Sequence, residues 1–197
     1  MLSSGPMRAF TVVLQAASVW LLLALVLGAS GLLRGARPPL PQILIVVLTA
    51  AVLVFYWTPT AFRRWALAVD LRGLVLIHVT RLVGIYFLVL HGQGELPYAF
   101  AVPGGWGDIT VAVTAIGVCL LARPATPVGR GVILAWNVLG LADIVLVVVT
   151  ASRLGLGDPD SMRALLRLPL SLLPTFLVPI IIATHVIIFA RLLRRAA

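Results

Sequence analysis

Apolar residues form six long blocks along the chain, separated by short segments rich in arginine, glycine, proline and aspartate. Each block has about 20 residues, the length at which an α-helix crosses a hydrocarbon layer of about 30 Å. The pattern predicts an all-α fold: a six-transmembrane-helix bundle with short loops, in one integral membrane domain over residues 1–197. The predicted spans are residues 9–33, 41–58, 73–91, 106–122, 131–150 and 173–193.

Two of the polar segments carry the signs of amphipathic helices that lie on a membrane surface. Asp158 is a typical helix cap, and Pro159 suits the first helical position after it. Phe62, Trp65 and Val69 form an apolar stripe at helical spacing after the second span. We therefore expect one or two interfacial amphipathic helices beside the six spans.

The first block has features of both a signal peptide and a membrane span. Arg8 precedes it, and the small residues Gly28, Ala29 and Ser30 lie towards its end. Its apolar run is longer than the core of about 7–15 residues that signal peptides have. We therefore expect a retained helix.

The composition agrees with a membrane protein. Hydrophobic residues make up 61% of the chain, charged residues 11%, and the mean hydropathy is +1.13, whereas a soluble domain is about 25% charged. The formal charge is +9, and all 15 basic residues are arginine. In so apolar a chain, we expect these arginines to lie at helix ends and meet anionic lipid. The predicted partner is the lipid bilayer, with a homo-oligomer or membrane complex as a further expectation and no nucleic acid.

The distribution of arginines predicts the orientation. With six spans, both termini and the connections after the second and fourth spans lie on one side, which holds more arginines and is therefore predicted to be cytoplasmic. We expect the cell membrane to be a bacterial inner membrane. The cytoplasmic set is Arg8, Arg63, Arg64, Arg72, Arg123, Arg130, Arg191, Arg194 and Arg195. The opposite set is Arg34, Arg37, Arg153, Arg163 and Arg167.

Several common enzyme sites are absent from the sequence. Cys119 is the single cysteine, which excludes an internal disulfide and thiolate-held metal clusters. The lack of lysine excludes a Walker-type phosphate loop and Schiff-base chemistry. Glu95 is the sole glutamate, and it is not part of a His-Glu-x-x-His motif. These absences make an enzyme the less favoured class.

Polar residues inside the predicted spans carry the functional signal, because a polar group in hydrocarbon needs a partner. Counting about 1.5 Å per residue places Gln15, His78, Asn137 and His185 in one layer, at depths of about 8–11 Å from the predicted cytoplasmic side. Each of the four comes from a different span.

Arg81 lies near the middle of the third span, and arginine keeps its proton in proteins. It therefore needs an anion, and Asp143 is the one carboxylate that the predicted spans place clearly inside the membrane. We predict an Arg81–Asp143 ion pair, with His78 on the same helix face as Arg81 because the two are three residues apart. Asn137 faces about 120° away from Asp143 on its own helix, which favours a separate interhelical hydrogen bond.

Two stretches have interruptions of the kind seen in broken transporter helices. Pro103-Gly-Gly-Trp-Gly-Asp108 cuts an otherwise apolar run. Either the fourth span is thin at that edge, or the glycine-rich turn dips inward and carries Asp108 with it; in a carrier, we expect Asp108 near the outer mouth. In the sixth span, Pro179 cannot donate a backbone hydrogen bond and would free the carbonyl of Thr175.

Four functions are compatible with these residues. The favoured one is a carrier or receptor for a small molecule or ion. An accessory or scaffold subunit, whose polar residues join helices, is the second. A b-type haem or quinone redox protein is the third, with His78 and His185 as haem ligands on two helices. Intramembrane hydrolysis by Thr184 beside His185 ranks last, because neighbours on a helix point about 100° apart. The predicted ligand-binding residues are His78, Arg81, Asp108, Asn137, Asp143 and His185.

The same residues resemble a family of uncharacterised bacterial multi-pass membrane proteins. The resemblance rests on Arg81-Leu-Val-Gly, Leu96-Pro97 with Pro103-Gly-Gly-Trp-Gly-Asp108, Trp136-Asn-Val-Leu-Gly-Leu-Ala-Asp143, and Pro174-Thr-Phe-Leu-Val-Pro179 with His185. It covers residues 73–193 and leaves out the first two spans. The family implies a bacterial inner-membrane location and no particular activity.

Overall fold

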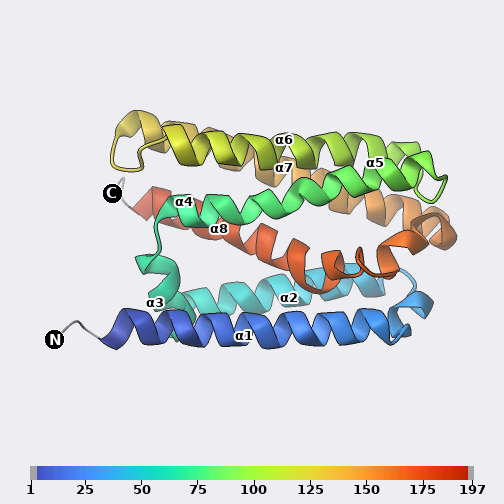
Figure 1. Cartoon of the computed structure of the whole chain (residues 1–197), viewed down its shortest axis with the longest axis horizontal. Helices are drawn as coiled ribbons and strands as arrows, with labels where there is room; N and C mark the ends of the chain where they lie inside the picture. Colours follow the sequence, from blue (N-terminus) through green and yellow to red (C-terminus); the bar gives the residue numbers. More distant parts are fainter. Residues whose placement is uncertain (1–3, 195–197) are drawn as a thin grey trace.

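The computed structural model describes residues 4–194, and within them the chain is all-helical, without a β-strand (Figure 1). Six segments are long and apolar enough to cross a membrane, as the sequence predicts. The α-helices are α1 (Ser4–Ala29), α2 (Leu40–Trp57), α3 (Ala61–Ala68), α4 (Leu71–Leu76), α5 (Gly84–Gly92), α6 (Tyr98–Leu121), α7 (Pro127–Gly157) and α8 (Val178–Arg194). The short 3₁₀ or π segments are η1 (Leu32–Gly35), η2 (Ile77–Val83), η3 (Pro159–Leu166) and η4 (Leu173–Leu177).

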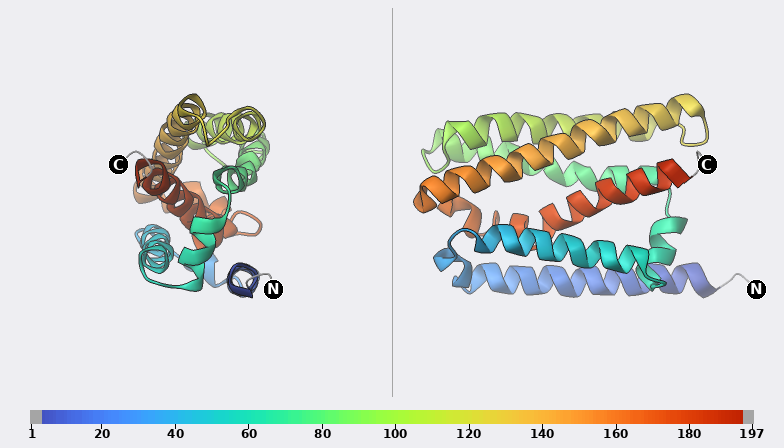
Figure 2. Two further views of the ribbon diagram at one scale, coloured as in Figure 1. Left: turned by 90° about the vertical axis from the view of Figure 1, so that its left-hand side faces the viewer. Right: turned by 180° about the vertical axis from the view of Figure 1, so that it is seen from behind.

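The long helices run side by side, and α1 begins at the end of the bundle where α8 ends (Figures 1 and 2). The span formed by α4, η2 and α5 packs against α6, which also packs against α7. On the other side of the bundle, α2 packs against α8 and η4, and α1 packs chiefly against α3. The side chains that form the polar site therefore come from the closely packed part of the bundle, and α1 lies at its edge.

The fourth span differs from its prediction. Helix α6 begins at Tyr98 rather than at residue 106, and it continues through Pro103 without a turn. The glycines of this stretch serve close packing: a Cβ atom on Gly105 would lie 2.8 Å from the carbonyl oxygen of Gly84, which belongs to α5. The prediction of a thin or re-entrant segment is therefore wrong, because these glycines let two helices touch.

Two of the spans contain a change of helical geometry. The third span becomes a 3₁₀ helix at η2 between two α-helical halves, and the sixth span starts as the π-helical segment η4. Pro179 follows η4 closely, and the indole nitrogen of Trp20 donates a 2.8 Å hydrogen bond to the carbonyl oxygen of Thr175. The free carbonyl predicted at Thr175 is thus satisfied from another helix.

Both expected connecting helices are present. The side chain of Thr60 caps α3, and that of Asp158 caps η3. Arg191 of α8 donates hydrogen bonds of 2.9 Å and 2.7 Å to the carbonyl oxygens of Ala66 and Val69, at the end of α3. Arg191 therefore joins α8 to the first connecting helix.

Candidate functional site

The 3₁₀ geometry of η2 positions the first two site residues. A 3₁₀ helix has 3.0 residues per turn, so side chains three positions apart lie one above the other. His78 and Arg81 have this spacing, and both are fully buried, with exposed fractions of 0%. The predicted shared face of these two residues is therefore present, and it points into the bundle.

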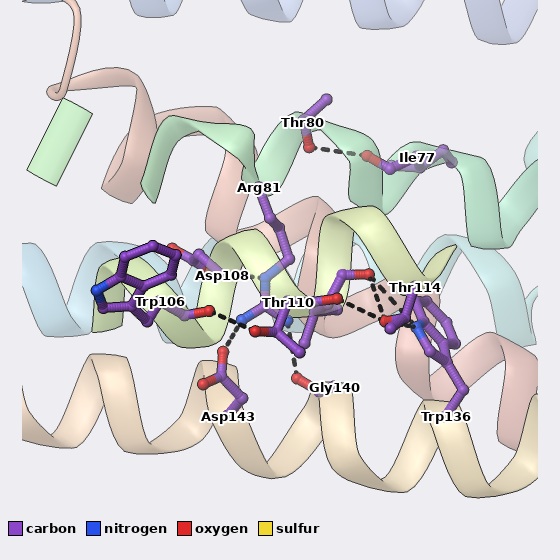
Figure 3. A network of polar contacts seen from close by, with 11 residues as sticks. Ile77, Thr80, Arg81, Trp106, Asp108, Thr110, Thr114, Trp136, Gly140 and Asp143 are labelled. Carbon is purple, nitrogen blue, oxygen red and sulfur yellow. Dashed lines mark hydrogen bonds and ion pairs between the residues drawn. The ribbon is translucent and has the colours of Figure 1, made fainter. Parts of the chain in front are cut away.

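Arg81 binds three groups on two neighbouring helices (Figure 3). Its Nε donates to a carboxylate oxygen of Asp108 at 2.6 Å, and its Nη1 donates to the carbonyl oxygen of Gly140 at 2.9 Å. Its Nη2 forms an ion pair with Asp143. The Arg81–Asp143 pair predicted from the sequence is present, and a second carboxylate completes the group.

The structure places Asp108 differently from the sequence-based prediction. The sequence placed it near the outer mouth, in a turn, and treated Asp143 as the one carboxylate inside a span. Asp108 instead lies within the continuous helix α6, its side chain is only 4% exposed, and it pairs with Arg81. The signal that identifies it is its place in an apolar run that is long enough to span a membrane from Tyr98 to Leu121.

Two glycines make room for the charged and aromatic side chains. A Cβ atom on Gly107 of α6 would overlap the carboxylate of Asp143. A Cβ atom on Gly140 of α7 would lie 2.7 Å from Cε1 of His185. Any larger residue at either position would displace a side chain of the site.

A second group, which we call the histidine layer, consists of His78, Trp136, Asn137 and His185. The two imidazole rings lie 4.1 Å apart between centroids, and Trp136 contacts both of them at 5.1 Å and 5.7 Å. His78, Asn137 and His185 are 0% exposed. The depth argument correctly grouped these three, but Gln15 is exposed on α1 and does not belong to the layer.

Hydrogen bonds fix which imidazole nitrogens are donors. The Thr184 hydroxyl donates to the carbonyl oxygen of Ile180 at 2.8 Å, so it accepts from Nε2 of His78 at 3.2 Å. Nδ1 of His185 donates to the amide oxygen of Asn137 at 2.8 Å, and the Asn137 amide donates back to the His185 carbonyl oxygen at 3.1 Å. The predicted interhelical hydrogen bond of Asn137 is therefore present. Nδ1 of His78 and Nε2 of His185 are buried without a hydrogen-bond partner in the described chain.

The histidine layer does not fit a bis-histidine haem. Two axial imidazoles stand on opposite faces of the macrocycle, but the rings of His78 and His185 contact each other directly. Their separation of 4.1 Å between centroids leaves no space for a porphyrin between them. Over residues 4–194, no group of three or more histidine, cysteine, aspartate or glutamate side chains is placed to hold a metal ion.

A cavity of about 100 Å³ reaches the charged group from one end of the bundle. Arg81 and Asp108 line its inner end. Its other end is lined by Pro38, between η1 and α2, and by Pro159, at the start of η3. Most of the wall between them is apolar and comes from α2, α7, η3, η4 and α8; Gln42 is one of its few polar residues. The site therefore has two parts: a charged group that borders a cavity, and a histidine layer packed away from it.

Comparison with known proteins identifies a family but no activity. Residues 38–193 match the family described as a domain of unknown function (DUF8737), and the chain belongs to this family. The match includes the second span, which the resemblance seen in the sequence left out. No curated protein and no solved structure matches the chain.

Proposed function

We propose that this member of a family without an assigned activity is a polytopic membrane protein that binds a small molecule in the cavity beside Arg81 and Asp108, as a carrier or receptor. The observation that carries the proposal is an apolar cavity that ends at a buried ion pair. An apolar pocket with a few convergent polar groups is the usual form of a small-molecule site. Charged residues at membrane depth are expensive and commonly mark a substrate or ion pathway.

The size of the cavity restricts the ligand. A water molecule needs roughly 10–15 Å³ of such volume, so about 100 Å³ accommodates several waters or an organic molecule with a handful of heavy atoms. A larger ligand would require α2 or the η3 segment to move, since both form part of the wall.

The location proposed for the protein is a bacterial inner membrane, with both termini in the cytoplasm. The six apolar helices support a membrane location. The excess of arginines on the side of the termini supports the orientation. In this orientation the end of the cavity that Pro38 and Pro159 line lies on the outer side of the membrane.

Blocking the cavity tests the proposal. The full chain is purified in lipid nanodiscs, and small neutral, cationic and anionic compounds are screened for the rise that each causes in the unfolding temperature. We expect at least one compound to stabilise the native chain, because a ligand that binds only the folded state raises its stability. Ala151 lines the cavity, and we expect Ala151→Phe to remove the effect. Ala135→Phe, at an exposed position of the same helix, is the matched control.

The scaffold alternative makes the opposite prediction. The histidine layer supports that alternative, because its side chains are buried and joined across helices by hydrogen bonds. If no small compound stabilises the native chain, or if Ala151→Phe leaves the effect of every ligand unchanged, the cavity is not a binding site and the scaffold function is preferred.

A further inference from the structure

When both of its carboxylates are ionised, the charged group around Arg81 is not neutral. Arg81 contributes one positive charge, which arginine retains in proteins. Asp108 and Asp143, its two partners, contribute two negative charges when both are ionised. In the described chain, these are the only charged side chains in the central part of the bundle that form ion pairs. With both carboxylates ionised, the group carries an excess of one negative charge. The Asp108 side chain is only 4% exposed and borders the apolar cavity, where an uncompensated charge is unfavourable, whereas the Asp143 side chain is 22% exposed.

Two polar side chains on the cavity wall, Asp108 and Gln42, offer oxygen acceptors to an occupant. Each of the three nitrogens of the Arg81 guanidinium already donates to a protein oxygen. One oxygen of Asp108 accepts from Arg81, and its other oxygen receives no hydrogen bond from the described part of the chain. Oε1 of Gln42, on the wall formed by α2, is buried and also lacks a donor. An occupant that brings N–H groups would satisfy both of these acceptors better than a carboxylate would.

We infer that the cavity binds a small primary ammonium ion with a short apolar body. An ammonium group supplies the missing positive charge and three N–H donors, and an alkyl body matches the apolar wall. Asp108 would accept from the ammonium group at the inner end, and the Gln42 amide is a further polar group on the wall of the same cavity. This inference rests on the proposed function, and it names the chemical class of ligand for the same cavity.

A series of ligands of equal size tests the charge argument. The full chain in nanodiscs is titrated at pH 7 with n-butylammonium, 1-butanol and butyrate, and the concentration that gives half of the maximal rise in unfolding temperature is recorded. An alkyl ammonium is protonated at this pH, since such groups have a pKa near that of lysine, about 10.4. Because hydrogen bonds to charged groups are roughly twice as strong as neutral ones, we expect n-butylammonium to act at a concentration at least about tenfold lower than 1-butanol. Butyrate should be the weakest of the three.

The outcomes separate this inference from the proposed function. If 1-butanol and n-butylammonium act at equal concentrations, or if butyrate is preferred, the ammonium inference is wrong and the cavity remains a binding site. If none of the three stabilises the chain and the wider screen also finds no ligand, both fail together.

Two variants test the charge and the hydrogen bond of the inferred site separately. Asp143 does not line this cavity, so Asp143→Asn removes the excess charge without removing a wall contact. We expect it to reduce the preference for n-butylammonium over 1-butanol to less than about twofold. Asp160→Asn, an exposed aspartate of a surface ion pair, should leave the preference unchanged.

Gln42→Leu removes the acceptor on the wall. We expect it to raise the half-effective concentration of n-butylammonium by about three- to tenfold. Gln15→Leu, at an exposed glutamine of α1, is the matched control and should have no effect. An unchanged response in Gln42→Leu, together with an unchanged preference in Asp143→Asn, would overturn the inference on the variants alone.

Discussion

At the scale of single residues, the shape of the guanidinium group explains why an arginine occupies position 81. Its Nε, Nη1 and Nη2 atoms point in three fixed directions, and each meets an oxygen: Asp108, the carbonyl of Gly140, and Asp143. Lysine carries the same charge on one nitrogen and cannot reproduce this planar arrangement. The site therefore depends on the geometry of the cation as well as on its charge.

Arg81→Gln would leave two carboxylates close together without a cation. Removing one partner of a buried ion pair costs about 3–5 kcal/mol, and we expect a loss of this size in the free energy of unfolding in nanodiscs. Arg81→Lys should be intermediate. Arg163→Gln is the control, because Arg163 pairs with Asp160 on the surface, with side chains 58% and 68% exposed, and such pairs contribute about 1 kcal/mol or less. Equal stability of Arg81→Gln and Arg163→Gln would contradict the role of Arg81.

Gly107→Ala tests the close packing beside Asp143. The added methyl group would overlap the Asp143 carboxylate, and overpacking of this kind costs about 1–3 kcal/mol. Gly117→Ala, on the same helix, is the matched control because a Cβ atom there meets nothing within 4 Å. We expect thermal unfolding to show a lower midpoint for Gly107→Ala and an unchanged or higher midpoint for Gly117→Ala. A neutral effect of Gly107→Ala would show that the Asp143 side chain can move without loss.

The sequence alone predicted part of this site. Arg81 and Asp143 could be paired because each lies well inside an apolar block and a buried guanidinium needs an anion. Asp108 was placed wrongly. The apolar run from Tyr98 is long enough for a span, but glycine after proline is equally compatible with a turn and with a helix in close contact with another. The distinction depends on the backbone of Gly84, which approaches from a different span.

At the scale of helices, the irregular segments place polar groups where regular helices would not. Segment η2 aligns His78 with Arg81, and the π-helical η4 with Pro179 leaves a carbonyl for Trp20. The sequence predicted the free carbonyl, since proline always removes a donor. It did not predict the 3₁₀ segment, because no residue type in η2 requires that geometry.

Trp20→Phe tests the contact between α1 and η4. Phenylalanine retains an aromatic ring against Phe176, whose centroid lies 5.0 Å from that of Trp20, but it cannot donate to Thr175. Because a hydrogen bond of this kind contributes about 1 kcal/mol, we expect a decrease of that size in the free energy of unfolding. Trp106→Phe is the control, since Trp106 is 58% exposed and its indole donates no hydrogen bond within residues 4–194. A similar small effect of both substitutions would argue against a specific role for the Trp20 hydrogen bond.

At the scale of the whole molecule, the position of the site agrees with the extent of the family match. All six predicted site residues lie within residues 38–193, and α1 precedes that range. Helix α1 contributes no residue to the charged group or to the histidine layer. The number of spans followed from the lengths of the apolar blocks, whereas the contacts between spans depend on side-chain shapes that a hydropathy pattern does not contain.

The arrangement of the loops leads to a prediction about orientation. The connections around Gln93 and Ala125 lie at opposite ends of the bundle, because they stand at the two ends of α6. Both residues are exposed. Cys119, the single cysteine, is buried and donates to the carbonyl oxygen of Arg72, so Cys119→Ala provides a background without a reactive thiol.

In this background, Gln93→Cys and Ala125→Cys are expressed separately in bacteria. The intact cells are then treated with a membrane-impermeant maleimide. The excess of arginines on the side of the termini predicts that this side faces the cytoplasm. We therefore expect Gln93→Cys to react on cells whose outer membrane admits the reagent, and Ala125→Cys to react only after the inner membrane is permeabilised. The reverse pattern would place the Pro38 and Pro159 end of the cavity on the cytoplasmic side. Reaction of both positions on intact cells would contradict a complete crossing by α6.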